Sequence, residues 1–104
     1  INSARCRAYN DIMLRGAAKG ERDYAVCGII HRNRIHGKTV DEVREILTDF
    51  NKKCSPEMNE SYIADKLRYH MNANYSPCTF LMNVSEECLK CERNNGVDRR
   101  ASTP

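Results

Sequence analysis

The chain has 104 residues, a formal net charge of +3 at pH 7 and 40% hydrophobic residues. This length suits a single domain, and the absence of an apolar run of about 18 residues excludes a membrane span. With no Trp and only two Phe, the chain has a modest apolar core for its size.

The first half contains two weakly marked helices before a glycine-punctuated loop. A first apolar stripe with helical spacing consists of Cys6, Tyr9 and Met13. The stretch from Gly16 to Gly20 ends it. A second stripe consists of Tyr24, Cys27 and Ile30, and it predicts a short second helix.

The middle helix carries the clearest start signal. Thr39 and Glu42 have the spacing of a capping box, in which a hydroxyl and a carboxylate bind backbone N–H groups at a helix start. Apolar residues follow at helical spacing: Val40, Val43, Ile46, Leu47 and Phe50. We therefore expect a helix from position 40 to about position 50.

Two later helices are expected to begin at Ser-Pro pairs, because serine caps a helix and proline is tolerated at its first position. The pairs are Ser55-Pro56 and Ser76-Pro77, and the last helix is expected to run to about Glu92. Residues 93–104 are almost without apolar side chains and predict a flexible polar tail. Residues 1–92 are thus the expected single helical domain.

Six cysteines in so short a chain predict a disulfide framework; they are Cys6, Cys27, Cys54, Cys78, Cys88 and Cys91. On one helix, Cys78 and Cys88 would lie about 15 Å apart. Bridged Cα atoms lie within about 7 Å, so these two cannot pair. We expect the three later cysteines each to bind one of the three earlier ones. The predicted fold is an all-α bundle of about five helices stapled by three disulfides, with the exact pairing open.

Disulfides indicate an oxidising compartment, so the chain is expected to be secreted. It begins with Ile1 rather than Met, as a mature chain would after removal of a signal peptide. Glycosylation sequons begin at Asn59, Asn74 and Asn83, and whether they carry glycans is left open.

The sequence contains no nucleophile elbow, phosphate loop, zinc-protease motif or calcium loop. The unit Cys88-x-x-Cys91 is typical of zinc and redox sites, but a second ligand pair and a preceding strand are both missing. His31, His36 and His70 have no spacing that points to catalysis. We expect neither an enzyme nor a metal or other cofactor.

A basic stretch is the candidate partner-binding surface, and it holds Arg15, Lys19, Arg22, Arg32, Arg34 and Lys38. Only Glu21 and Asp23 oppose it within the stretch. Such a surface suits an acidic protein, a heparan-like polymer or phosphate, although a solvated face without a partner has the same composition. We expect no nucleic-acid partner. Aromatic residues on the apolar stripes either fill the core or line a cavity for a small ligand.

Three segments carry a family resemblance: Phe50-Asn51-Lys52-Lys53-Cys54, then Tyr75-Ser76-Pro77-Cys78-Thr79-Phe80-Leu81, and then Cys88. Together they resemble the later helices of the arthropod odorant-binding superfamily, especially small salivary proteins of blood-feeding flies. The resemblance covers residues 39–92 at most, and the family's Cys-x-x-x-Cys pair is missing. It implies a secreted helical protein, either a salivary antagonist of host complement, haemostasis or inflammation, or a carrier.

The leading hypothesis is a secreted, non-enzymatic protein that binds a host or other extracellular protein through the basic surface. The alternative is a carrier that sequesters a small apolar or amine ligand. A protein antagonist of this kind should lose affinity as ionic strength rises, whereas a carrier should gain thermal stability from its ligand.

Overall fold

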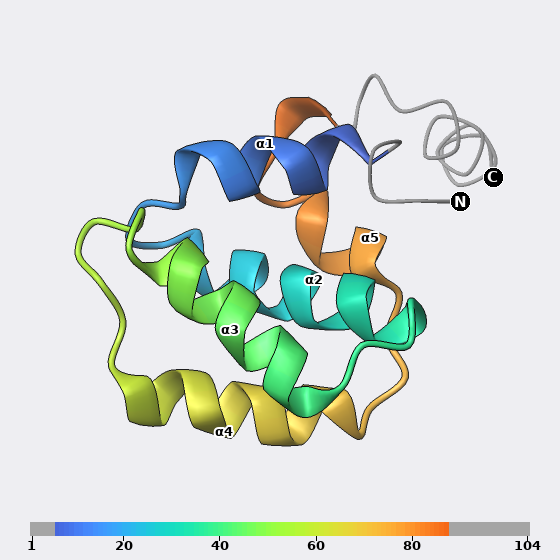
Figure 1. Cartoon of the computed structure of the whole chain (residues 1–104). Coiled ribbons are helices and arrows are strands. Elements are labelled where there is room, and N and C mark those ends of the chain that lie inside the picture. Colours follow the sequence, from blue (N-terminus) through green and yellow to red (C-terminus); the bar gives the residue numbers. More distant parts are fainter. Residues whose placement is uncertain (1–5, 88–104) are drawn as a thin grey trace, which may run out of the picture.

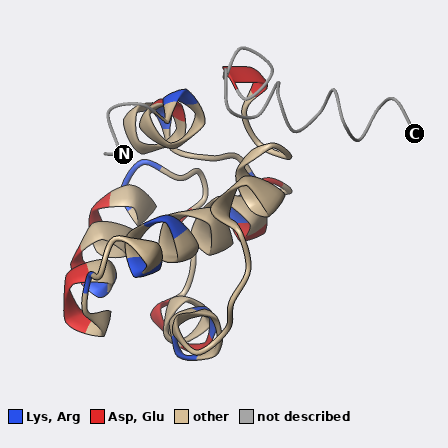
Figure 2. Ribbon diagram, turned by 90° about the vertical axis from the view of Figure 1, so that its right-hand side faces the viewer, with Lys and Arg blue, Asp and Glu red and all other residues tan. Residues whose placement is uncertain are grey.

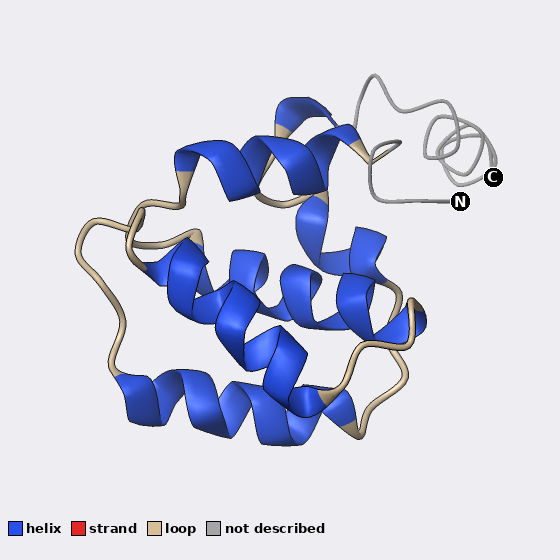
Figure 3. Ribbon diagram, viewed as in Figure 1, coloured by secondary structure: helices blue, strands red, loops and turns tan. Residues whose placement is uncertain are grey.

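A computed structural model describes residues 6–87 of the chain, and in this part it is an all-α fold of five helices (Figures 1 and 3). The helices are α1 (Arg7–Arg15), α2 (Arg22–Ile35), α3 (Val40–Asn51), α4 (Glu60–Met71) and α5 (Pro77–Leu81). The predicted all-α class is therefore confirmed. None of the described helices is both long and apolar enough to cross a membrane. The predicted tail at 93–104 lies outside the described residues.

Helix α2 lies at the centre of the bundle and packs against each of the other four helices (Figure 1). Every residue from Ala25 to Asn33 is buried. The helix spans 14 residues, so it is longer than the short helix that the sequence predicts. A helix that is covered on all sides needs no polar face, and this is why its helical periodicity is weak.

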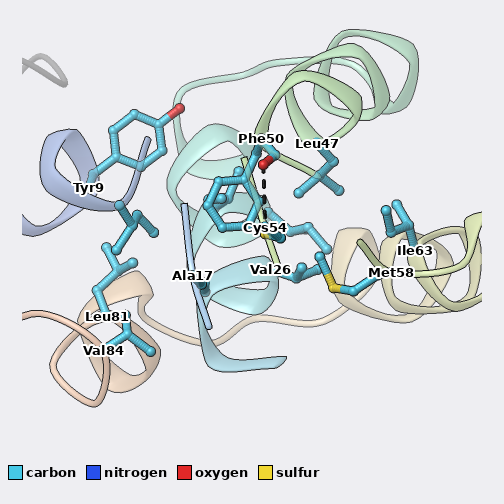
Figure 4. Packing of buried hydrophobic residues seen from close by; sticks show 14 of the residues in the cluster. Tyr9, Ala17, Val26, Leu47, Phe50, Cys54, Met58, Ile63, Leu81 and Val84 are labelled. Atoms are coloured by element: carbon cyan, nitrogen blue, oxygen red, sulfur yellow. Dashed lines mark hydrogen bonds between the residues drawn. The ribbon is translucent and has the colours of Figure 1, made fainter. Parts of the chain in front are cut away.

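The core forms where α1, α3, α4 and α5 press their apolar stripes onto α2 (Figure 4). Its largest fully buried side chains include Phe50, Ile12, Ile29, Ile30, Leu47 and Leu67. Cys54 is buried among them, and its thiol donates a hydrogen bond to the carbonyl oxygen of Phe50 at 3.6 Å. The core is thus held by apolar burial, the dominant favourable term in folding.

The capping box at the start of α3 is confirmed. The Thr39 hydroxyl accepts a hydrogen bond from the Glu42 backbone N–H, and the Glu42 carboxylate accepts one from the Thr39 N–H at 2.8 Å. These contacts also lower the pKa of Glu42. The buried face of the helix carries Val43, Leu47 and Phe50. Two residues of the apolar stripe predicted for this helix are not in the core, since Val40 is exposed and Ile46 is only half-buried.

The prediction that α4 begins at Ser55-Pro56 is wrong, since the helix begins at Glu60. The intervening residues form a loop that the buried side chain of Asn51 holds in place. Its amide nitrogen donates to the Met58 carbonyl at 2.9 Å, and its amide oxygen accepts from the Met58 N–H at 2.8 Å. These bonds satisfy the backbone of Met58 outside a helix, so the helix starts later.

The last helix is also shorter than predicted. Ser76 caps α5 as expected, but the helix ends at Leu81 and does not continue toward Glu92. The chain then turns along α1, where the Ser85 hydroxyl donates to the Asp11 carboxylate at 2.8 Å. Arg15 of α1 donates to the carbonyl oxygen of Val84. These contacts with α1 replace the hydrogen bonds that further helical turns would have made.

Helices α2 and α5 approach so closely that only glycine fits at position 28. A Cβ atom there would lie 2.4 Å from Leu81 Cδ2 and 2.7 Å from Leu81 Cγ. We expect Gly28→Ala to lower the free energy of unfolding by about 1–3 kcal/mol, the usual cost of overpacking a core. Urea titration measures this loss. In a Leu81→Ala background the same substitution should cost nothing or stabilise, and an undiminished cost there would contradict the steric explanation.

Candidate functional site

The six residues of the predicted basic surface do not gather on one exposed face. Arg15 forms ion pairs with Asp11 at 3.0 Å and Glu21 at 3.6 Å. Arg22 is half-buried and donates to the carbonyl oxygen of Pro56. Figure 2 shows basic and acidic segments on the same helices rather than on separate faces. The guanidinium groups of Arg15 and Arg22 therefore already bind groups of the same chain.

The remaining four basic residues divide between the surface and the interior. Lys19 and Lys38 are exposed, as a binding surface requires. Arg34 is half-buried and directs two nitrogens at groups of the same chain. Arg32 is only 4% exposed, so it is not a surface residue. The sequence pattern gave the charge of these side chains but not their direction.

The expected three-disulfide framework is corrected by the structure. All four described cysteines, Cys6, Cys27, Cys54 and Cys78, are free thiols. The helix that was expected to carry three cysteines as a spine ends at Leu81, so the geometry behind the pairing is absent. Cys27 and Cys54 instead use their sulfur atoms in buried hydrogen bonds. Cys88 and Cys91 lie outside the described residues.

A chain of hydrogen-bonded polar side chains, of which only Arg34 is not fully buried, crosses from α2 to α4. Arg34 Nε donates to His31 Nδ1 at 3.1 Å, which requires that the neutral His31 carries its proton on Nε2. The Nε2–H group of His31 donates to His70 Nδ1, and the two nitrogen atoms lie 2.8 Å apart. His70 Nε2 in turn donates to the sulfur of Cys27 at 3.1 Å. One guanidinium thereby fixes the tautomers of both imidazoles.

The pKa values of this polar chain exclude an activated nucleophile. Burial and the neighbouring His70 and Arg34 lower the pKa of His31 to about 4, and burial lowers that of His70. Burial together with the charge of Asp23 raises the pKa of Cys27 to about 11. At neutral pH the chain therefore holds a thiol and two neutral imidazoles, whereas a nucleophilic cysteine needs a thiolate.

The same chain does not make a metal site. His70 directs its two ring nitrogens at different partners, so Cys27 and His31 do not converge with it on one point. Across residues 6–87, His, Cys, Asp and Glu form no group of three or more that could hold a metal ion. The polar chain is thus an internal hydrogen-bonding network between α2 and α4.

Aromatic rings surround this network on the side toward α5. His31 stacks on Phe80 with ring centroids 5.4 Å apart and an interplanar angle of 4°. Tyr75 meets both rings edge-on, at 5.6 Å from His31 and 5.9 Å from Phe80. The ring of Tyr69 lies edge-on to His70 at 4.9 Å. Tyr75 and Tyr69 therefore pack against the buried rings of His31 and His70.

These tyrosines line an open recess of about 710 Å³ where α4 ends, which we call the tyrosine face. Its lining residues are Asp65, Arg68, Tyr69, Asn72, Ala73, Asn74 and Tyr75. Tyr69 is 60% exposed and Tyr75 is 46% exposed. A hydrogen bond between the two hydroxyl groups raises the pKa of Tyr75. This face is the candidate functional site.

The expectation that the aromatic residues on the apolar stripes fill the core holds for Tyr9 and Phe50 but not for Tyr24 or Tyr69, which are exposed. A signal for Tyr69 was present in the sequence. The buried stripe of α4 runs through Ile63, Leu67 and His70, and position 69 lies off that stripe. The position of Tyr75 depends on the loop between α4 and α5, which no periodicity describes.

A smaller recess of about 310 Å³ lies at the other end of α4. It is lined by Gly20, Arg22, Asp23, Glu57, Met58, Asn59 and Tyr62. The Asp23 carboxylate there pairs with Lys66 at 2.8 Å and accepts a hydrogen bond from the Tyr62 hydroxyl. The negative charge of Asp23 is thus already compensated by Lys66. The recess therefore attracts a cationic ligand less strongly than its acidic residues alone would indicate.

Comparison of the chain with protein-family models, with curated proteins and with solved structures finds no match. The likeness to the odorant-binding superfamily therefore stays a prediction from the sequence. Function has to be inferred from the geometry of the described residues.

Proposed function

We propose that this protein is a non-enzymatic binding protein that recognises a partner protein through the tyrosine face. The observation that carries this is the pair of exposed tyrosines, Tyr69 and Tyr75, flanked by Arg68 and by the amides of Asn72 and Asn74. Tyrosine and arginine are enriched among the residues that dominate protein-binding energy, and asparagine supplies adaptable hydrogen bonds beside them.

The tyrosine face is also preorganised, which lowers the entropy cost of binding. Arg34 Nη2 donates to the carbonyl oxygen of Tyr75 at 3.0 Å and so ties the loop to α2. The Asn72 side chain donates to the Arg68 carbonyl at 2.8 Å at the end of α4. The rings of Tyr69 and Tyr75 rest on buried histidines. A partner would thus meet tyrosines that are already held in position.

A binding role rather than catalysis is supported by the protonation state of Cys27, whose contact with His70 is the only buried thiol–imidazole contact among residues 6–87. Cys27 is fully enclosed and keeps its proton at neutral pH, because burial raises its pKa. An enzyme would need such a group at a surface that substrate reaches. The tyrosine face itself contains no nucleophile–base pair.

A carrier of small ligands is the alternative, and the recess beside Asp23 and Glu57 would be its site for an amine. Carriers bury most of their ligand surface, whereas both recesses described above are open. The extracellular location and the role as an antagonist of a host defence pathway remain proposals from the sequence. The location rests on the cysteine count, to which the free thiols add no support, and the antagonist role rests on the resemblance to the odorant-binding superfamily.

The test is affinity capture with the immobilised protein and its Tyr69→Ala/Tyr75→Ala variant, read by quantitative mass spectrometry. We expect the proteins retained by the unmodified chain to be lost from the variant, because its two aromatic anchors are gone. Tyr24→Ala is the matched control, since Tyr24 is 44% exposed and lies outside the tyrosine face. Equal losses from the double variant and the control would show that the tyrosine face is not the binding site.

A further inference from the structure

Arg32 is a buried cation whose hydrogen-bonding edge has no partner. Its side chain leaves α2 and lies over the ring of Tyr9 on α1, with the guanidinium carbon 5.9 Å from the ring centroid. Both Nε and Nη2 are enclosed by protein and make no hydrogen bond. None of the ion pairs among the described residues includes Arg32.

The two unpartnered nitrogens are adjacent on the guanidinium and form one edge of it. That edge presents two parallel N–H groups, the geometry that binds a carboxylate or phosphate through two hydrogen bonds. Arg32 differs in this from Arg15, Arg22 and Arg34, each of which donates at least one guanidinium hydrogen bond to a group of the same chain. The edge is therefore formed, charged and unoccupied by any group of the described chain.

The neighbouring side chains of Asn33 and Tyr9 do not supply a hydrogen-bond acceptor or a negative charge to this edge of Arg32. The Asn33 amide donates to the Tyr9 hydroxyl at 3.2 Å and to the Ile29 carbonyl at 2.8 Å, so the adjacent side chain is itself committed as a donor. The Tyr9 ring face attracts the cation but cannot accept two N–H hydrogen bonds in its plane. Burying an arginine without a counter-anion destabilises the folded state, and a bound anion would offset this cost.

We propose that Arg32 is the receptor of an oxyanion-binding site between α1 and α2, which takes a carboxylate or phosphate through Nε and Nη2. The site lies apart from the tyrosine face and does not depend on it. Because the edge is closed to bulk water, each hydrogen bond to the anion is stronger there than at an exposed arginine. Arg32 thus acts as a specific anion site rather than as part of a diffuse basic surface.

The test compares thermal unfolding midpoints in chloride, acetate and inorganic phosphate at equal ionic strength. We expect acetate, phosphate or both to raise the midpoint of the unmodified protein by several degrees, as ligand binding to the folded state requires. Arg32→Met keeps the aliphatic volume and removes the charge, so its midpoint should be higher in chloride and should not respond to either anion. Comparison of the rise in midpoint in acetate with the rise in phosphate shows which oxyanion Arg32 binds more tightly.

Two controls separate this site from general salt effects. Arg44→Met removes an exposed arginine of α3 that pairs with Asp41, and this variant should respond to anions as the unmodified protein does. Arg32→Lys keeps the charge without the two-nitrogen edge and should lose most of the response. Equal anion responses in the unmodified protein and in Arg32→Met would overturn the proposal.

A second measurement needs no variant, should Arg32→Met fail to fold. The Nε–Hε resonance of Arg32 is followed by nuclear magnetic resonance while phosphate and then acetate are added to the unmodified protein. We expect a saturable shift of the Arg32 signal and only a small, linear one for Arg44. An Arg32 signal that moves with neither anion would contradict an oxyanion site.

Discussion

Replacing Gly16 by alanine is expected to destabilise the fold by about 3–5 kcal/mol, the range of the most severe single substitutions. Gly16 ends α1 with φ +77° and ψ −165°, a backbone conformation that is almost restricted to glycine. It is also buried against the end of α3. A Cβ atom there would lie 2.2 Å from the carbonyl oxygen and 2.6 Å from the carbonyl carbon of Lys53.

The obstacle at Gly16 is backbone, so a side-chain rotation cannot relieve it. Lys53 lies in the turn after α3, and its ammonium group donates to the Met13 carbonyl of α1. Moving Lys53 away would therefore loosen the contact between α1 and the α3–α4 loop. Both the strained φ and the steric overlap act against the folded state alone.

Gly37→Ala is the matched control for this prediction. Gly37 has φ +79°, nearly the value at Gly16, but a Cβ atom there would meet nothing within 4 Å. It should cost only the conformational strain, about 1–2 kcal/mol. Urea unfolding of both variants gives the difference directly, at equal m-values. Equal losses at the two positions would mean that the close approach to Lys53 does not limit the fold.

Lowering the pH from 7 to 5 is expected to remove about 2 kcal/mol of stability through His31 alone. The unfolded residue titrates near its ordinary pKa of 6.5, whereas burial lowers the folded value to about 4. The folded state therefore binds fewer protons in this window. The contribution of His31 is complete above pH 6.5 and is lost as the pH falls toward 4.

His70 acts in the same direction, because burial and Lys66 lower its pKa as well. A proton on either ring would place a second donor where the network needs an acceptor, since His31 Nδ1 accepts from Arg34 and His70 Nδ1 accepts from His31. Protonation thus breaks the chain that connects α2 with α4. The carboxylates whose pKa values are lowered in the fold, those of Asp11, Asp23 and Glu42, contribute to the pH dependence mainly at still lower pH.

Chemical unfolding at pH 7, 6 and 5 measures this dependence. His31→Gln does not titrate, so its stability should fall much less over the same range. His36→Gln is the control. His36 is exposed after the end of α2, and its pKa is lowered by slight burial and by charges that include those of Arg32 and Lys38, so this variant should reduce the dependence much less than His31→Gln does. A pH dependence that persists in full in His31→Gln would show that another group causes it.

The sequence predicted the parts of the fold that local rules determine. The capping box of Thr39 and Glu42 places α3 correctly because both partners lie within one turn. Ser76 and Pro77 likewise mark the start of α5. The end of α5 could not be predicted in this way, since it depends on two hydrogen bonds with α1: Ser85 donates to the Asp11 carboxylate, and the Val84 carbonyl oxygen accepts from Arg15.

The cysteine count was misleading for a related reason. It states how many thiols the chain has but not which groups they meet after folding. Cys27 of α2 accepts a hydrogen bond from His70 of α4, and Cys54 donates one to the carbonyl oxygen of Phe50. Buried cysteines of this kind behave as small apolar residues with a weak donor, so they need no bridge.

The candidate site was beyond the sequence because it depends on direction rather than composition. Four of the six basic residues have side chains that turn inward, as Arg32 does, or that bind their own chain, as Arg34 does, whereas Lys19 and Lys38 are exposed. Tyr69 was expected in the core, and it lies outside because α4 buries only the stripe that includes His70. The exposed position of Tyr75 is set by the loop between α4 and α5. The helix positions were foreseeable, but the packing that orients these side chains was not.

The most direct test compares two double variants in binding to a protein captured by the unmodified chain. Tyr69→Ala/Tyr75→Ala removes the tyrosine face, and Lys19→Ala/Lys38→Ala removes the exposed part of the basic stretch. We expect the first to lower affinity at least about 100-fold, the effect of losing two anchor residues of about 1.4 kcal/mol or more each. The second should change it less than tenfold, with little dependence on salt. Full affinity in the tyrosine variant, with loss in the lysine variant, would contradict a binding role for the tyrosine face.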